Sequence, residues 1–431
     1  MDKFFDYDLI VCGGGLSGFA AAVCASRLGV KTLIIERYGF LGGAATNSLS
    51  NPFMKYMEDE EWVNKGVFGE IIRRLDLKGG LFSGNQATFN EEILKIILDE
   101  MTEEAGVDVL FHSFIPEVKV EGDRITSVIT ASKAGLTEFK AKCFIDGTGD
   151  ADIAAFSGCK TETGDADGFC QPMTLNFRIS DVDRNKYAPV CPGPKAELYG
   201  VDSKEVTKTV NALYRKFRED GKINNPRENL LTFPCMSENM IHFNATRVVM
   251  HDATDPFSLS DAERIARRQM VEIFYFLKEN IPGFEKSNIA MSAPQIGVRE
   301  SRRLVGMYVL TADDLLSCVK FDDSIARGVY NIDIHNPKGS GTVLKSIPKG
   351  DYYTIPLRSL MPGEISNLIV CGRPISATFE AHSAIRIMPI ATCIGHAAGA
   401  AAYLGITNKK DARDVSYSDV QDILLKQGGL F

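Results

Sequence analysis

The chain contains 431 residues, with 48 Lys and Arg against 56 Asp and Glu, so its formal net charge is −8. Hydrophobic residues make up 45% of the chain, a composition that excludes a fibrous or disordered protein. At roughly 100–200 residues per domain, this length predicts two or three domains. The acidic balance argues against a nucleic-acid partner, whose phosphates need a basic surface, and against an anionic membrane surface.

Ten cysteines are scattered singly along the chain, and no two of them have the C-x-x-C spacing. This pattern argues against a zinc site, an iron–sulfur cluster or a redox dithiol, so we predict no metal. We interpret most of the cysteines, Cys191 included, as small buried residues in a reducing compartment. The acidic start with Asp2, Asp6 and Asp8 does not resemble a signal peptide. We therefore expect a cytoplasmic protein.

Apolar runs and helical spacing predict the elements of the first third of the chain. In order, these are a strand at 8–12, a helix at 19–28, a strand at 31–36, a helix at 90–105, a strand at 107–111, an antiparallel meander over 117–142, and a returning strand at 143–146. The second strand is apolar throughout, which is typical of a parallel strand that is buried on both faces. The order predicts a βαβ unit in a parallel sheet.

The middle of the chain mixes short strands with longer helices, and the end returns to the earlier pattern. The later predictions are strands at 174–179, 230–234 and 241–245, helices at 204–219 and 260–279, a buried strand at 367–372, and a helix of small residues at 387–403. The most membrane-like stretch, 387–406, contains Pro389 and His396, and we interpret it as a buried helix. We predict an α/β fold with a doubly wound Rossmann-like domain. Residues 1–160 form its first part and 362–431 its return segment, with an α+β substrate domain inserted at 161–361.

The first strand and helix are joined by a G-x-G-x-x-G sequence, formed by Gly13, Gly15 and Gly18. Gly13 permits a tight turn, Gly15 lets a pyrophosphate approach the backbone, and Gly18 lets the helix pack on the strand. Glu36 ends the second strand, 23 residues beyond Gly13, and can accept hydrogen bonds from ribose hydroxyls. The full unit predicts dinucleotide binding, and the acidic residue favours a ribose without a 2′-phosphate.

Four stretches together resemble the bacterial FAD-dependent oxidoreductases of the glutathione-reductase-like fold, which are related to fumarate reductase and succinate dehydrogenase flavoproteins. The stretches are 13–36, 39–46, 144–152, and 368–373 with 386–401. They cover both ends of the chain. Gly147 stands where the family usually has Ala, and His396 where relatives usually have Gln.

The resemblance implies FAD as the cofactor. It places the double glycine 42–43 along the ribityl and pyrophosphate, the 148–150 turn near the pyrophosphate, and the segment after the last strand around the flavin. Pro389 in a first-turn position leaves free N–H groups that could stabilise reduced flavin. The residues expected to bind the cofactor are Gly13, Gly15, Leu16, Ser17, Gly18, Glu36, Arg37, Gly42, Gly43, Ala44, Thr46, Ile115, Thr148, Gly149, Asp150, Gly372, Arg373, Met388 and Ile390.

Candidate catalytic residues are His382 for proton transfer, Arg386 for an anionic group or the flavin edge, and Arg303 for the substrate. His382 could instead hydrogen-bond a tight turn, and Arg303 could belong to an ion-paired helix face. Further polar candidates are Arg247, His251, Arg299, Arg302 and the segment 171–174.

A second nucleotide fingerprint is missing, because the segment 339–342 lacks a third glycine and a buried strand before it. We therefore predict an oxidoreductase that moves a hydride between a small organic substrate and flavin N5, and the arginines hint at an anionic substrate. The sequence does not identify the direction, the other electron donor or acceptor, the oligomeric state, or whether the flavin is covalently attached. Two alternatives stay open: a non-catalytic or redox-sensing flavin-binding protein, and, less favoured, an RNA-modifying flavoprotein.

Overall fold

A seven-stranded sheet forms the centre of the protein. The computed structural model describes residues 5–82, 88–187, 203–235 and 237–431, and Cys191 lies outside these ranges. The strand order is β7-β2-β1-β10-β9-β8, and β21 also pairs with β10. The strands are β1 (Phe5–Cys12), β2 (Thr32–Ile35), β7 (Asp108–Leu110), β8 (Phe114–Glu121), β9 (Arg124–Ser132), β10 (Gly135–Asp146) and β21 (Leu368–Val370). The predicted α/β fold is confirmed.

The inner parallel strands are buried on both faces, as their apolar runs indicate, whereas the edge strand β7 is partly exposed. In β1, Leu9 and Val11 join one hydrophobic cluster, while Ile10 and Cys12 join another on the opposite face. The first cluster packs under α1 (Leu16–Arg27), α3 (Glu91–Ala105) and α10 (Met388–Asn408). The return segment therefore completes the sheet and the helical layer begun by the N-terminal part.

One prediction in this region is wrong. The strand at 143–146 is the end of a continuous β10, which pairs antiparallel with β9 over 135–140 and parallel with β1 over 139–146. The stretch contains no Gly or Pro after Gly135 that would break the strand, so the meander and the parallel sheet share it.

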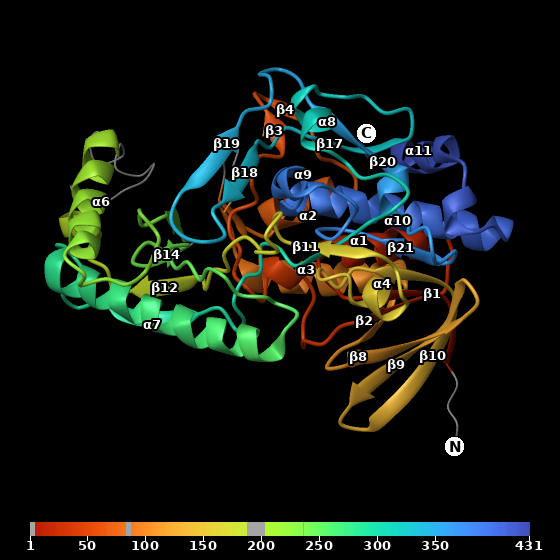
Figure 1. Ribbon diagram of the computed structural model, residues 1–431, viewed down its shortest axis with the longest axis horizontal. Helices are drawn as coiled ribbons and strands as arrows, with labels where there is room; N and C mark the ends of the chain where they lie inside the picture. The colour runs from red at the N-terminus through yellow and green to blue at the C-terminus, as the bar shows by residue number, and fades with distance from the viewer. Residues whose placement is uncertain (1–4, 83–87, 188–202, 236) are drawn as a thin grey trace.

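A second unit has its own sheet and core, and lies at the left of Figure 1. Its strand order is β13 (Thr232–Pro234), β14 (Ile241–Phe243), β12 (Phe177–Ser180) and β15 (Asn288–Ser292). The long helix α7 (Pro256–Asn280) and α6 (Ser203–Glu219) contribute to the same core as these strands. All of these elements overlap strands and helices predicted in the middle of the chain except β15, where no strand was predicted.

Residues 310–361 pack differently from that unit. Ile325, Ile332 and Ile355 join the cluster that holds α1 and α10, although the segment lies within the predicted insertion. It includes the hairpin of β18 (Ile332–His335) and β19 (Thr342–Lys345), which the sequence analysis did not predict. The limits of the three predicted segments stay a prediction.

The remaining elements are β3 (Met57–Glu58), β4 (Glu61–Trp62), α2 (Val67–Leu77), β5 (Leu81–Phe82), β6 (Thr88–Phe89), α4 (Asp152–Phe156), β11 (Thr161–Thr163), α5 (Arg184–Tyr187), β16 (Arg302–Leu304), α8 (Ala312–Leu316), β17 (Ser324–Gly328), β20 (Tyr353–Pro356), α9 (Phe379–Ile385) and α11 (Tyr417–Lys426), with short 3₁₀ turns at Gly43–Ala45, Leu357–Leu360 and Ala412–Asp414.

Helices α1 and α10 touch through their backbones. A Cβ on Gly395 would lie 1.9 Å from the carbonyl oxygen of Ser17, and one on Gly399 would lie 2.2 Å from that of Ala21. Among the described residues, α10 is the one helix long and apolar enough to cross a membrane, but 78% of its apolar window is buried inside the protein. The burial agrees with the interpretation of this stretch as a core helix.

The helix contact predicts the effect of a single methyl group. Gly395→Ala should lower the free energy of unfolding by about 1–3 kcal/mol, because the new Cβ forces α10 away from α1. The control is Gly69→Ala in α2, where the nearest atoms are 3.9 Å away and alanine should be neutral or slightly stabilising. Thermal unfolding of the cofactor-loaded proteins measures both. Equal midpoints for Gly395→Ala and the original protein would contradict the contact.

Candidate active site

The carboxyl ends of four parallel strands stand level at one edge of the sheet. Cys12 pairs with Ile35 and with Asp146, and Asp146 pairs with Val370, so one row of residues ends all four strands. Each chain segment that leaves this row enters the same space. Ligands of open α/β sheets bind at such an edge.

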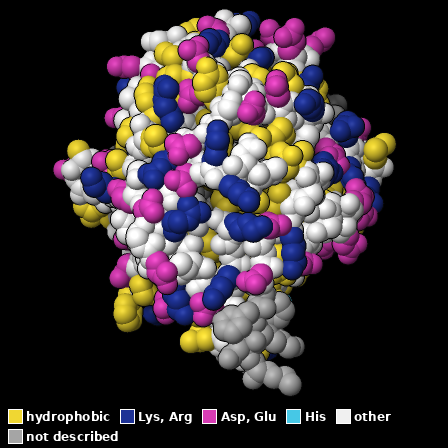
Figure 2. Space-filling model, turned by 90° about the vertical axis from the view of Figure 1, so that its right-hand side faces the viewer, with side chains coloured by type: hydrophobic (Ala, Val, Ile, Leu, Met, Phe, Trp, Pro, Cys, Tyr) yellow, Lys and Arg dark blue, Asp and Glu magenta, His cyan; other side chains and the backbone are white. Residues whose placement is uncertain are grey.

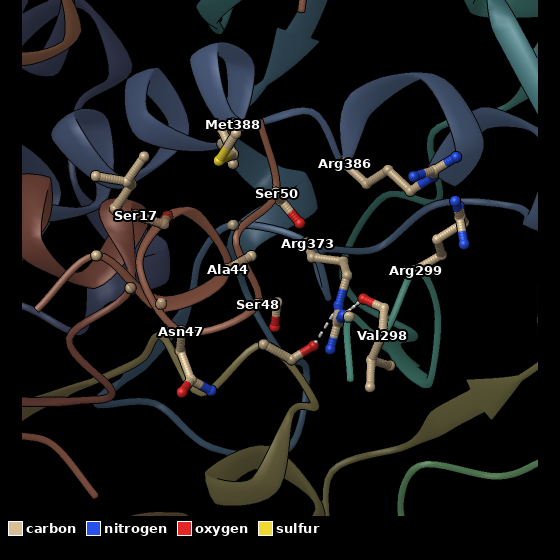
Figure 3. A pocket seen from close by; sticks show the side chains of 18 of the residues that line it. Ser17, Ala44, Asn47, Ser48, Ser50, Val298, Arg299, Arg373, Arg386 and Met388 are labelled. Carbon is tan, nitrogen blue, oxygen red and sulfur yellow. Dashed lines mark hydrogen bonds between the residues drawn. The ribbon is translucent and has the colours of Figure 1, made fainter. Parts of the chain in front are cut away.

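A cavity of about 670 Å³ lies at this edge. Its sequence-predicted lining residues are Gly13, Gly15, Leu16, Ser17, Glu36, Arg37, Gly42, Gly43, Ala44, Ile115, Thr148, Gly149, Asp150, Gly372, Arg373, Arg386 and Met388. Figure 3 shows Ser17, Ala44 and Asn47 on one side of the space and Arg299 and Arg386 on the other. The structure thus brings together segments that are more than 370 residues apart in the chain.

Two helices begin at the cavity without a side-chain cap. Gly15 precedes α1 and Ile387 precedes α10, and both line the cavity with the first residues of their helices. Uncapped first-turn N–H groups and the positive end of the helix dipole favour an anion. Ser17 adds a buried hydroxyl with no hydrogen-bond partner in the described chain.

Bare backbone surrounds the N-terminus of α1. Gly43 has φ +53°, and a Cβ there would lie 2.8 Å from the Cα of Gly15, so the double-glycine turn and the first glycine turn meet backbone to backbone. Glu36 closes this end, since its two carboxylate oxygens accept hydrogen bonds from Gly14 N at 2.7 Å and Tyr38 N at 2.9 Å. This carboxylate is therefore held in place at the cavity wall.

The turn after β10 is braced by charged groups. Asp146 is fully buried and accepts hydrogen bonds from Thr148 N, Thr148 Oγ1 and Ala154 N at 2.7–3.1 Å. Asp150 accepts from Ser301 Oγ at 2.6 Å and from Arg373, which also donates to Gly149 O at 2.7 Å and to Val298 O. Figure 3 shows the Arg373 contact with Val298. Arg373 therefore ties the last strand to this turn while lining the cavity.

Three residues predicted to bind the cofactor do not line the cavity. Gly18 packs α1 on the glycine turn, because a Cβ there would lie 2.0 Å from Gly13 O. The Thr46 hydroxyl donates to Leu41 O at 2.7 Å and so closes the double-glycine turn from behind. Ile390 is fully buried in the first turn of α10. All three support the lining residues, and direct contact with a cofactor stays a prediction for them.

Three arginines line the far part of the cavity: Arg227, Arg299 and Arg386. Within the described ranges none of them forms an ion pair, in contrast to Arg302, Arg303 and Arg373, which all meet carboxylates. Arg299 donates to Pro172 O at 2.7 Å and to Thr174 Oγ1 at 2.5 Å, and the Nε of Arg386 is buried with no partner in the described chain. Burial, together with the charge of nearby Arg386, lowers the pKa of Arg299.

A hydrogen-bonded network lies beside these arginines. The Tyr330 hydroxyl donates to Asp333 Oδ2 at 3.0 Å, and His335 Nε2 lies 3.5 Å from the same oxygen. Arg247 lies within 3.0 Å of His335 Nδ1, and since arginine only donates, the ring proton belongs on Nε2, toward Asp333. Burial lowers the pKa of His335 to about 3, with Arg299 adding to the shift, so the ring is neutral near pH 7.

The structure places two of the three predicted catalytic residues behind the cavity wall. His382 is fully buried on α9, and both ring nitrogens lack a partner in the described chain. Burial and the charges of Arg303, Arg386 and Arg373 hold its pKa well below the usual range. Its role in proton transfer stays a prediction, and the cavity favours other groups.

Arg303 is part of a buried ion pair. It donates to Glu300 Oε1, to Ala377 O at 3.2 Å and to Gly164 O at 3.1 Å, and both charged side chains are almost fully buried. Glu300 also accepts from Gln171 N at 2.9 Å. The ion pair is the alternative that the sequence left open, but the expected helix face is wrong, because Arg303 lies in the strand β16. Of the three catalytic candidates, Arg386 alone lines the cavity.

The remaining polar candidates divide in the same way. Arg299 lines the cavity, whereas Arg302 binds Asp150 O and Asp152, and His251 contacts Val249 O and Asp261. The sequence analysis missed Arg227, Tyr330, Asp333 and His335. Only the last two carry a signal, because Ile332-Asp333-Ile334-His335 alternates apolar and polar side chains, as a strand with one polar face does.

Comparisons with known proteins agree with this geometry. Residues 8–424 match the family model described as FAD dependent oxidoreductase. A thiamine thiazole synthase from Methanococcus vannielii is 28% identical over 162 residues, 35% of this chain and 59% of the relative. A dihydrolipoyl dehydrogenase from Trypanosoma brucei brucei is 48% identical over 44 residues, 10% of this chain and 9% of the relative. The chain thus spans about three fifths of the first relative and a tenth of the second.

A solved structure shares the fold across the whole chain. The geranylgeranyl bacteriochlorophyll reductase-like protein from Thermoplasma acidophilum superimposes with a TM-score of 0.50 at 14% identity, over 99% of this chain and 85% of that one. The family match identifies FAD as the cofactor, and the cavity fits it. The glycine backbone, the uncapped α1 N-terminus and the fixed Glu36 suit the pyrophosphate and ribose, while α10 begins where a flavin ring can meet it.

The meeting of the two glycine turns can be tested by cofactor retention. Gly43→Ala should weaken FAD binding by about 1–3 kcal/mol, or roughly 5- to 150-fold in Kd, because its Cβ would push against Gly15. Gly79→Ala is the control, since Gly79 also has positive φ, +66°, but no atom within 4 Å. Flavin fluorescence on dialysis measures both. Equal FAD loss in the two variants would attribute the effect to backbone strain alone.

The buried ion pair predicts a stability effect for Arg303. Arg303→Met should cost about 3–5 kcal/mol of unfolding free energy, because it leaves Glu300 buried without its partner. Adding Glu300→Gln should recover part of that loss, because glutamine carries no charge that would be buried without a partner. Burial already favours the neutral form at this position, since it raises the pKa of Glu300 to about 7. Thermal unfolding of the single and double variants measures this. A stable Arg303→Met protein with lost turnover would instead support the catalytic assignment.

Proposed function

Because the chain belongs to the FAD dependent oxidoreductase family, we propose that it transfers a hydride between a small anionic organic substrate and flavin N5. The observation that carries the anionic part is the group of cavity-lining arginines without carboxylate partners. The closer relation to fumarate reductase and succinate dehydrogenase flavoproteins is part of the proposal, as is a cytoplasmic location. The relation rests on the sequence motifs, and the location rests on the singly scattered cysteines.

The arginines need an anion for a physical reason. Figure 3 shows the guanidinium groups of Arg299 and Arg386 beside each other at the end of the cavity. Two like charges in a partly buried site repel each other. The attraction of an opposite charge that lies near both offsets this repulsion. Arg227 adds a third positive charge, and among the residues that the structure describes Asp333 is the carboxylate that lines the cavity near these arginines. A carboxylate or similar anion would accept hydrogen bonds from these groups and balance their charge.

Proton transfer would be carried by the network at the same end. When bound, FAD supplies a hydride acceptor or donor at flavin N5, and oxidation of a C–O or C–N bond also releases a proton. Burial alone would raise the pKa of Asp333, but hydrogen bonds from His335 and Tyr330 and the positive charge of Arg386 lower it, so Asp333 is anionic near neutral pH. The contacts of its carboxylate with Tyr330 and His335 both fall on Oδ2, and within the described ranges Oδ1 accepts no hydrogen bond. Asp333 is thus the candidate proton acceptor that lines the cavity.

The alternatives gain less support from the structure. A non-catalytic flavin protein predicts a closed pocket, whereas this cavity is lined at its rim by Leu344, which is 65% exposed. An RNA-modifying enzyme needs a basic surface, and the face in Figure 2 intersperses basic and acidic side chains. With a net charge of −8, we favour a metabolite over nucleic acid or membrane as the partner. The second electron donor or acceptor is left open by this proposal.

Absorbance spectroscopy tests the proposal directly. The purified protein should show flavin bands that move into the supernatant on acid precipitation if FAD is noncovalent. An anaerobic titration against small carboxylic acids, alcohols and amines should then bleach the bands with an anionic compound and not with its neutral ester. A colourless protein that cannot be reconstituted with FAD would refute the assignment, and bleaching by neutral compounds alone would refute its anionic part.

Arginine variants locate the anion. Arg299→Met and Arg386→Met should each lower kcat/KM by roughly 10- to 150-fold, the effect of losing a charged hydrogen bond of about 1.5–3 kcal/mol, with FAD content unchanged. Arg268→Met is the matched control, because Arg268 is an exposed arginine on α7. Steady-state kinetics with the anionic reductant from the titration measures all three. Unchanged kinetics in both cavity variants would remove the arginines from substrate binding.

A further inference from the structure

The cavity is also lined by apolar side chains, and two of them are exposed at its rim. Leu231 and Phe233 line it from the segment around β13, and Leu344 lines it from β19. Leu344 is 65% exposed and Leu231 is 38% exposed. Single exposed apolar side chains are ordinary on a protein surface, but these come from two separate segments and face one opening.

The two sides of the rim are fastened to each other. Arg247, from the segment after β14, donates to the carbonyl oxygens of Gly339 and Gly341 at 3.1 and 3.0 Å, in the turn of the β18–β19 hairpin. Met250 N donates to Pro337 O at 3.2 Å. A Cβ on Gly341 would lie 4.0 Å from the Glu228 carboxylate, so the hairpin runs beside the segment that carries Leu231. The rim is therefore a defined opening between two braced segments.

The kinds of residue that line the cavity indicate what kind of molecule it binds. Glycine backbone lines one part of the cavity, Arg299 and Arg386 line the opposite part, and the exposed side chains of Leu231 and Leu344 line its rim. A small hydrophilic acid would bind at Arg299 and Arg386 and leave Leu231 and Leu344 exposed to water. A molecule with an anionic group and an apolar portion would cover both regions at once, and burying apolar surface contributes binding free energy in proportion to its area.

We propose that the substrate is an amphiphilic acid, with its anionic group at Arg299 and Arg386 and its apolar portion between Leu231, Phe233 and Leu344. The assignment rests on the proposed function for its anionic end and adds the apolar half. It also explains the hairpin, which brings Leu344 to the rim on the same element pair that carries Asp333 and His335 to the cavity wall.

Binding of unreactive carboxylates to the FAD-loaded protein tests the proposal without turnover. Butanoate, hexanoate and octanoate would be titrated below their micelle concentrations, with the flavin absorbance change and calorimetry as readouts. The Kd should fall by roughly threefold to fourfold for each added methylene. Octanol should bind more weakly than octanoate, because it lacks the charge.

Variants separate the two ends of the site. Leu231→Ser with Leu344→Ser should flatten the dependence on chain length while leaving the Kd of butanoate unchanged. Leu77→Ser with Leu425→Ser is the matched control, since these exposed leucines lie on α2 and α11, and it should keep the full dependence. Arg299→Met should weaken all three acids by a similar factor.

Each failure has its own signature. Equal affinity for butanoate and octanoate, with both weakened by Arg299→Met, would overturn the apolar half and leave the anionic site standing. An unchanged chain-length dependence in the Leu231→Ser, Leu344→Ser protein would place the apolar contact elsewhere and overturn the rim assignment. No binding of any carboxylate would refute the proposed anionic site itself.

Discussion

The backbone contact between α1 and α10 is the constraint on which the site depends. Two helices normally lie 8–10 Å apart because side chains separate them, but here Gly395 and Gly399 remove the separating groups. The helices come from opposite ends of the chain, and both begin at the same cavity without side-chain caps. Their close approach therefore brings two positive helix ends to one ligand. A cofactor with a pyrophosphate in its middle and an electron-accepting ring at one end suits this arrangement.

The sheet supplies the second constraint, which is register. Because Cys12, Ile35, Asp146 and Val370 stand in one row, every following loop leaves the sheet at the same level. The loops are then joined sideways by polar contacts, of which the bonds from Arg373 to Gly149 and Asp150 are the clearest. The cofactor half is thus built largely from backbone at strand ends, with few side chains free to vary.

The sequence predicts the cofactor half of the cavity better than the catalytic residues, because the cofactor half is built from backbone. The glycine turn, Glu36 and the segment after β21 are local signals, since a tight turn or a close backbone approach requires glycine at a fixed position. The catalytic predictions were weaker for the opposite reason. His382 and Arg303 lie within a few residues of Arg386 and Arg299, which line the cavity. The fold nevertheless buries both of them away from the cavity. No local pattern distinguishes an arginine that meets Glu300 from one such as Arg299 that faces a cavity.

The β18–β19 hairpin is a second feature that sequence patterns do not predict. All four residues of β19 are exposed, so no buried alternation marks the strand, and the Gly339–Thr342 segment carried meaning only as a failed nucleotide motif. In the fold these glycines expose carbonyl oxygens that accept hydrogen bonds from Arg247, and the hairpin brings Asp333, His335 and Leu344 to the cavity wall.

The part of the cavity opposite the glycine turns therefore consists of side chains on other segments of the chain. Exchange of residues in the hairpin or in 227–233 can alter what is bound there while the strand-end register and the α1–α10 contact keep the flavin in place. One family can in this way keep a cofactor site fixed by backbone geometry and vary its chemistry through the loops opposite.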